Sequence, residues 1–150
     1  MPKVETITIG KWKEPAVNLH FTVGVGGDNG TADVMLIQTM LRYIGASQGK
    51  NNFKLGIPMS ELPKITGICD AKTQRAIWKF QITNAKHLRN PDGLIHPASY
   101  AGRSITPGEK RVMTITLMHY FASDAALFAP EPNYVQGLIK IEPLLAPWLT

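Results

Sequence analysis

The sequence predicts a small, mainly α-helical protein, a three-helix bundle with a minor β element formed by the N- and C-terminal extensions. Three segments carry apolar residues at spacings of three and four, which places them on one face of a helix. An N-terminal segment instead alternates apolar and polar residues, the pattern of a half-buried strand. The 150 residues suit one domain with extensions. We expect an N-terminal β arm over 1–25, a helical domain over 26–105, and a C-terminal helix and tail over 106–150 that pack on it.

The β arm is predicted from residues 17–23, where every second side chain is apolar. Residues 6–9 are predicted to form a second short strand, with Gly10 and Pro15 interrupting the chain between the two.

The first helix is expected to follow the glycine-rich segment 24–30 and to end at Gly45, a common C-terminal stop. Thr31 or Asp33 is expected to cap its start, because a short oxygen-bearing side chain can accept hydrogen bonds from the free backbone N–H groups there. Its buried stripe is predicted to be Val34, Ile37, Leu41 and Ile44.

The second helix is predicted to start at the cap residue Asp70 and to end near residues 84–86. The polar segment 46–64 before it is expected to be a long loop. The letters NPDG at 90–93 predict a turn, because proline fixes one dihedral and glycine permits a positive φ. The buried side is expected to carry Ala76, Ile77 and Phe80, and the solvent side Lys72, Arg75 and Lys79.

The third helix is predicted from the capping pattern TPGE at 106–109 and should run to about residue 121. His119 falls on its apolar face and is expected to be a hydrogen-bonded core or rim histidine. Several prolines after residue 128 exclude one long helix in the tail. Residues 134–141 are predicted to be a strand that pairs with the N-terminal strands.

Composition limits the function classes. The chain is 44% hydrophobic and 18% charged, which is typical of a globular protein. No apolar run approaches the roughly 20 residues that a membrane span needs, and no signal-peptide stretch is expected at the N-terminus. The lone Cys69 excludes an internal disulfide. A net charge of +5 favours anionic partners.

Three segments, covering about residues 23–97, resemble the peptidoglycan-binding domain family. The family's first block has an Asp-Val pair, a glutamine, two apolar residues and a glycine, and its second has Gly, Thr, Ala-Ile and Phe-Gln at fixed spacing. Residues 91–97 are similar to the Pro-Asp-Gly turn that follows in longer members. The matching residues here are Asp33, Val34, Gln38, Met40, Leu41 and Gly45 in the first block, and Gly67, Thr73, Ala76, Ile77, Phe80 and Gln81 in the second.

The resemblance implies a helical domain that binds bacterial cell-wall peptidoglycan and has no catalytic site, metal or cofactor of its own. Two departures fall in the loop expected to line the binding cleft: Thr66 replaces the usual Asp, and Asp70 the usual Gly. They bear on ligand affinity and specificity more than on the fold, because Asp70 is a good helix cap.

Wall glycan and stem peptide offer hydroxyls, amides and carboxylates, which suit a shallow cleft with a few polar side chains. Gly67 is expected to turn the chain tightly into the second helix. Gln38 and Gln81 are expected to hydrogen-bond loop backbone, with ligand contact as the alternative. The candidate ligand-binding residues are Thr66, Asp70, Thr73, Gln74, Asp92, His96 and Tyr100. Each of these also has a plainer interpretation as a cap, a turn residue or solvated surface.

Other chemistry is less well supported. His87, Asp92 and His96 have zinc-ligand composition but no zinc-site spacing, so no metal is expected. Cys69 near a helix start could be a nucleophile, although a small buried residue fits the apolar string there. Nucleic-acid binding is not expected, because the second helix has basic residues with only Trp78 nearby and no clustered basic arm is present.

We therefore expect a non-catalytic module that tethers itself or a partner at the wall. The partner would be peptidoglycan together with a separate enzyme or a secretion-system protein. Without a signal peptide, delivery to the periplasm or the cell exterior would follow a non-classical route. The alternatives are a protein-interaction module of a secretion or phage system that keeps the fold without wall binding, and a cell-wall hydrolase with an unrecognised site.

Overall fold

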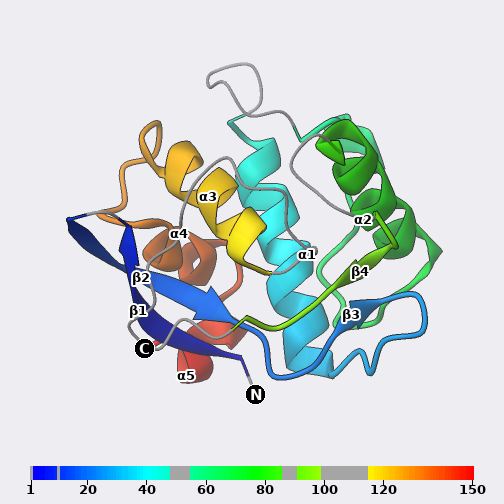
Figure 1. The fold of residues 1–150 in the computed structure, drawn as a ribbon, viewed down its shortest axis with the longest axis horizontal. Coiled ribbons are helices and arrows are strands. Elements are labelled where there is room, and N and C mark those ends of the chain that lie inside the picture. The colour runs from blue at the N-terminus through cyan, green and yellow to red at the C-terminus, as the bar shows by residue number, and fades with distance from the viewer. Residues whose placement is uncertain (1, 10, 48–54, 86–90, 99–114) are drawn as a thin grey trace.

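A computed structural model describes residues 2–9, 11–47, 55–85, 91–98 and 115–150 (Figure 1). The described part is mainly helical with a minor β component, as predicted. Its strands form two small antiparallel pairs, β1 with β2 and β3 with β4. No helix within these ranges is long and apolar enough to cross a membrane. In chain order the elements are β1 (Lys3–Ile9), β2 (Trp12–Asn18), β3 (Val23–Gly24), α1 (Thr31–Gly45), the 3₁₀-helix η1 (Met59–Glu61), α2 (Ala71–Thr83), β4 (Leu94–Ile95), α3 (Ile115–Ala126), α4 (Tyr134–Ile141), the 3₁₀-helix η3 (Pro143–Leu145) and α5 (Ala146–Leu149).

β1 and β2 form an antiparallel hairpin in which Lys3 faces Asn18. The expectation that Pro15 interrupts the chain was wrong: Pro15 lies inside β2, and a hairpin tolerates it because each strand has an unpaired edge. The prediction of one strand over 17–23 was also wrong, because β2 ends at Asn18 and β3 begins at Val23. The backbone N–H groups of His20 and Phe21 donate to the carboxylate of Asp33, at 2.9 and 3.1 Å, instead of joining a ladder.

The second sheet pairs β3 with β4, with Val23 opposite Ile95 and Gly24 opposite Leu94. β4 was not predicted from the sequence. Gly24 has a φ of +134°, and a Cβ there would collide with the carbonyl oxygen of Gly93, so the pairing requires glycine. Gly93 itself has a φ of +78°, as predicted for the glycine of the turn at 90–93, whose first residue lies outside the described residues.

α1 is the central helix and is buried on most sides. The predicted cap was wrong: the helix starts after Gly30 without a side-chain cap, because Asp33 uses its carboxylate on the preceding loop. Gly45 ends the helix but is followed by a right-handed Ala46, so it is not a left-handed stop. A Cβ at Gly45 would lie 2.8 Å from Leu62 Cδ1, and close packing therefore explains this glycine.

α2 agrees with its prediction at both ends. The Asp70 side chain caps the first turn by accepting from the Thr73 N–H at 2.9 Å, and Asn84 is the C-cap. The predicted stripe of Ala76, Ile77 and Phe80 is buried.

The C-terminal part differs most from prediction. Residues 134–141 form helix α4 and not a strand, because Asn133 caps the segment and Tyr134, Val135 and Leu138 are buried at helical spacing. Within the described residues the tail therefore adds no strand to either sheet. The predicted helix start at 106–109 lies outside the described residues, and α3 continues to Ala126.

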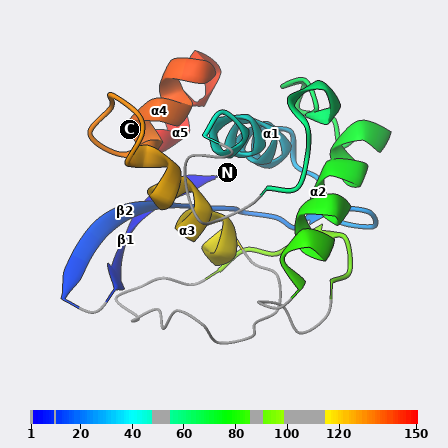
Figure 2. The same cartoon turned by 90° about the horizontal axis from the view of Figure 1, so that it is seen from above.

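One hydrophobic core extends from Ala16 of β2 to Leu149 of α5. α1 lies between α2 on one side and α3 and α4 on the other, and its close helix neighbours are α3 and α4 (Figure 2). The C-terminal helices α3 and α4 thus pack on α1, and the N-terminal hairpin packs on α3, α4 and α5.

Candidate functional site

The loop that enters α2 is hydrogen-bonded by one buried side chain of α1, that of Gln38. The Oε1 atom of Gln38 accepts from the N–H groups of Thr66 and Gly67, at 2.8 and 2.9 Å. Its Nε2 atom donates to the Ile68 carbonyl at 3.0 Å. The predicted role of Gln38 as a partner of loop backbone is confirmed. Gly67 has a φ of +78° at this turn, as its predicted role requires.

Asp70 and Thr73 continue this network into α2. Asp70 Oδ1 accepts from the Thr73 hydroxyl at 2.6 Å, and Thr73 Oγ1 accepts from Gln38 Nε2 at 3.0 Å. The hydroxyl and the backbone N–H of Thr73 hold the pKa of Asp70 below its usual value. Thr73 is fully buried, so its hydroxyl belongs to the support of the loop.

The exposed side of this loop carries the other candidate residues. Thr66, Ile68 and Asp70 face solvent, and Gln74 is half-buried with its Nε2 atom donating to the Cys69 carbonyl at 3.1 Å. Thr66 Oγ1 accepts from the Ile68 N–H at 3.2 Å, so its hydroxyl takes the turn-stabilising role that a carboxylate could have here.

A second glutamine holds the turn before β4. Gln81 is buried; its Nε2 atom donates to the Leu94 carbonyl at 2.9 Å and its Oε1 atom accepts from the Gly93 N–H at 2.6 Å. Its predicted role is confirmed as well. Asp92 and His96 flank this turn, with His96 Nε2 3.7 Å from Asp92 Oδ2 and Nδ1 3.2 Å from Thr22 Oγ1.

The structure thus brings the candidates together in two groups, which β3 joins. One group is Thr66, Asp70, Thr73 and Gln74; the other is Asp92 and His96. Gly24 of β3 pairs with Leu94 of β4, and β3 also contacts α2. Tyr100 and His87 lie outside the described residues.

Two other sequence hypotheses can be compared with the geometry. Across the described residues, no group of three His, Cys, Asp or Glu side chains could hold a metal ion. The pKa of the Cys69 thiol is raised, mainly by burial. A reactive thiolate needs a lowered pKa instead.

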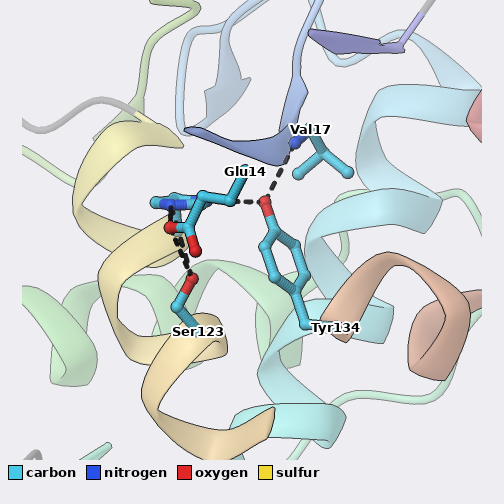
Figure 3. A network of polar contacts seen from close by, with 5 residues as sticks. Glu14, Val17, Ser123 and Tyr134 are labelled. Atoms are coloured by element: carbon cyan, nitrogen blue, oxygen red, sulfur yellow. Dashed lines mark hydrogen bonds and ion pairs between the residues drawn. The ribbon is translucent and has the colours of Figure 1, made fainter. Parts of the chain in front are cut away.

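A separate polar cluster lies where β2 meets α3 and α4 (Figure 3). His119 is fully buried; its Nε2 atom lies 2.7 Å from Glu14 Oε1 and its Nδ1 atom 2.8 Å from the Tyr134 hydroxyl. That hydroxyl accepts from the Val17 N–H at 2.9 Å, and Ser123 Oγ donates to Glu14 Oε1 at 3.2 Å. The prediction of a hydrogen-bonded core histidine is confirmed, but its partners were not foreseen.

This cluster is not a serine–histidine–carboxylate triad. A triad needs the carboxylate on one ring nitrogen and the hydroxyl on the other. Here Glu14 and Ser123 both lie at Nε2 of His119. Because a carboxylate only accepts, Nε2 is the protonated nitrogen and cannot take the serine proton. The hydrogen bond from His119 is the main cause that lowers the pKa of Glu14. The cluster therefore ties the N-terminal hairpin to the C-terminal helices.

Comparison with models of known protein families, with curated proteins and with solved structures found no match to this chain. The features of the chain that bear on function are therefore the two loops held by glutamines and the sequence blocks that form them.

Proposed function

We propose that this chain binds bacterial peptidoglycan without cleaving it, and that α1, α2 and their loops form a peptidoglycan-binding-like helical unit. The observation that carries the proposal is that the three sequence blocks of the resemblance are joined to one another by two buried amides. Gln38 of the first block holds Thr66 and Gly67 of the second, and Gln81 of the second holds Gly93 of the third.

These amides matter because they fix the shape of two surface loops. A buried amide that is hydrogen-bonded at both its oxygen and its nitrogen rigidifies the groups around it. A surface that is already ordered loses less conformational entropy when it binds a ligand. The loop before α2 and the turn before β4 are thus suited to hold polar groups in place for a flexible polymer.

The exposed chemistry of these loops fits the wall. Thr66, Gln74 and His96 offer a hydroxyl, an amide and an imidazole to sugar hydroxyls and peptide amides. Lys72 lies close enough to Asp70 for its charge to lower the pKa of that carboxyl. A cation beside the loop can pair with the carboxylates of stem peptides.

The proposed mechanism is non-covalent tethering, which raises the local concentration of a partner at the wall. Within this proposal the partner is a separate enzyme or a secretion-system protein. The site of action is the periplasm or the cell exterior, after delivery by a non-classical route.

Co-sedimentation with purified sacculi tests the proposal. We expect the wild-type chain to pellet with the wall and Ile68→Glu to lower the bound fraction at least about fivefold, since a new carboxylate at the loop apex repels wall carboxylates. Leu144→Glu is the matched control: Ile68 and Leu144 are 67% and 65% exposed, so both changes spare the core, but Leu144 lies in η3. Wild-type protein left in the supernatant, or equal loss in both variants, would contradict the proposal. Release of soluble muropeptides would favour a hydrolase instead.

A further inference from the structure

The outer face of α2 carries an apolar stripe that folding does not explain. Ala71, Arg75, Trp78 and Ile82 follow one another at spacings of four, three and four, so they share one face of the helix. The core residues of α2, among them Ile77 and Phe80, lie on the opposite face. Trp78 is 47% exposed and Ile82 50%. A surface helix normally places polar residues there, so two large apolar side chains indicate a contact with another molecule.

Positive charge borders the stripe. Arg75 stands within it, and Lys72 and Lys79 lie along one side. Lys79 Nζ pairs with Glu61 Oε2 at 2.6 Å. The pKa of Glu61 is lowered first by this hydrogen bond and further by the charges of Lys79, Arg75 and Lys72, so the three cations gather around one carboxylate. The surface therefore carries two carboxylates, those of Glu61 and Asp70, and the three cations. Its net charge is positive.

We propose that this face docks an amphipathic helical segment of a partner protein whose apolar side is bordered by carboxylates. Helical segments bind such faces through anchors at i, i+3, i+4 and i+7 spacing. From Ala71 to Ile82 the stripe extends about 16 Å at the usual rise of a helix, enough for roughly three turns of a partner. Carboxylates on the partner would meet Arg75 and Lys72, which favours an acidic segment over a basic one.

Two other occupants fit the face less well. A second copy of the chain would place Arg75 and its neighbouring lysines against like charges, which is unfavourable. A wall glycan could stack on Trp78, but a sugar also needs converging polar groups, and the next large residue along the stripe is the aliphatic Ile82. Lys72 borders both this face and the exposed side of the loop before α2, whereas Trp78 and Ile82 lie further along the helix, away from that loop.

The test uses two synthetic helical peptides that share one leucine stripe and differ only in having Glu or Lys at the bordering positions. Each is titrated into the full-length, ¹⁵N-labelled protein. We expect the Glu peptide to shift the amides of α2 and the Trp78 indole. Arg75→Glu should weaken its binding at least about fivefold and strengthen binding of the Lys peptide. Trp78→Ser combined with Ile82→Ser should abolish binding of the Glu peptide. The circular dichroism spectrum should stay unchanged, since both side chains are half-exposed.

The controls separate this inference from wall binding. The Ile68→Glu variant should no longer bind sacculi but should still bind the Glu peptide. The Arg75→Glu variant should bind the Glu peptide more weakly. The inference is overturned if neither peptide shifts α2, or if both bind equally. It is also overturned if the double serine variant loses a self-association seen in the wild type, or if soluble muropeptides and not the Glu peptide shift the Trp78 indole.

Discussion

Tyr134→Phe is expected to loosen the junction between the N-terminal hairpin and the C-terminal helices. The Tyr134 hydroxyl is buried. Among the described residues, it accepts from the Val17 N–H at 2.9 Å and lies 2.8 Å from His119 Nδ1. The substitution removes one oxygen and keeps the ring. Any loss of stability therefore reports the hydrogen bonds and not a cavity.

The expected size follows from the partners left behind. Leaving a buried donor or acceptor without its partner costs about 1–3 kcal/mol, and because both losses arise from one hydroxyl we expect about 2–4 kcal/mol in total. For a chain of this size, 1 kcal/mol lowers the melting temperature by roughly 2–4 °C. The loss should appear in urea unfolding as a lower midpoint with an unchanged slope.

Tyr43→Phe is the matched control, because the buried Tyr43 hydroxyl makes no hydrogen bond to any described residue. Burial, with the nearby charge of Glu131, raises the pKa of Tyr43 to about 12. Removing this hydroxyl should be neutral or slightly stabilising. Equal effects of the two substitutions, or a loss below about 0.5 kcal/mol for Tyr134→Phe, would refute the assigned contacts.

Three further results are expected. Glu14 has a pKa below its ordinary 4.5, so its ionised form stabilises the fold above that pH, and this stabilisation is lost as the pH falls through the lowered pKa; Glu14→Gln should reduce the fall in the unfolding midpoint between pH 5 and pH 3, and an unchanged pH profile would argue against the hydrogen bond from His119 to the Glu14 carboxylate. Gly137→Ala should cost about 1–3 kcal/mol, because its Cβ would lie 2.5 Å from the Tyr43 ring; a neutral result in thermal unfolding would show that α1 and α4 can separate. Gln38→Met should cost about 2–4 kcal/mol and expose the amides of Thr66 and Gly67 to hydrogen exchange, because they lose their buried acceptor; continued protection would show that Gln38 does not hold these two amides.

Local patterns in the sequence predicted the parts of the fold that depend on near neighbours. Asp70 caps a helix whose first N–H groups lie within three residues of it, so its type and position were sufficient. The roles of Gln38 and Gln81 followed from a general rule for buried amides, and the family pattern supplied their positions. The turn at Gly93 followed from the proline and glycine around it.

Features that depend on distant parts of the chain could not be predicted. Asp33 was expected to cap its own helix, but its carboxylate serves the loop of His20 and Phe21. Glu14 and His119 are 105 residues apart, and nothing local to either shows that they meet. The residues of α4 include the β-branched Val135, Ile139 and Ile141, so their propensity permitted a strand. The segment is a helix because Asn133 caps its start and Gly137 packs against the Tyr43 ring.

We propose that the two loops held by Gln38 and Gln81 form a surface for wall fragments. Titration of a soluble disaccharide–tetrapeptide muropeptide into ¹⁵N-labelled protein measures this directly, residue by residue. We expect saturable amide shifts within residues 66–74 and 92–96. Shifts confined to the hairpin or to the C-terminal helices, or none at millimolar muropeptide, would contradict it.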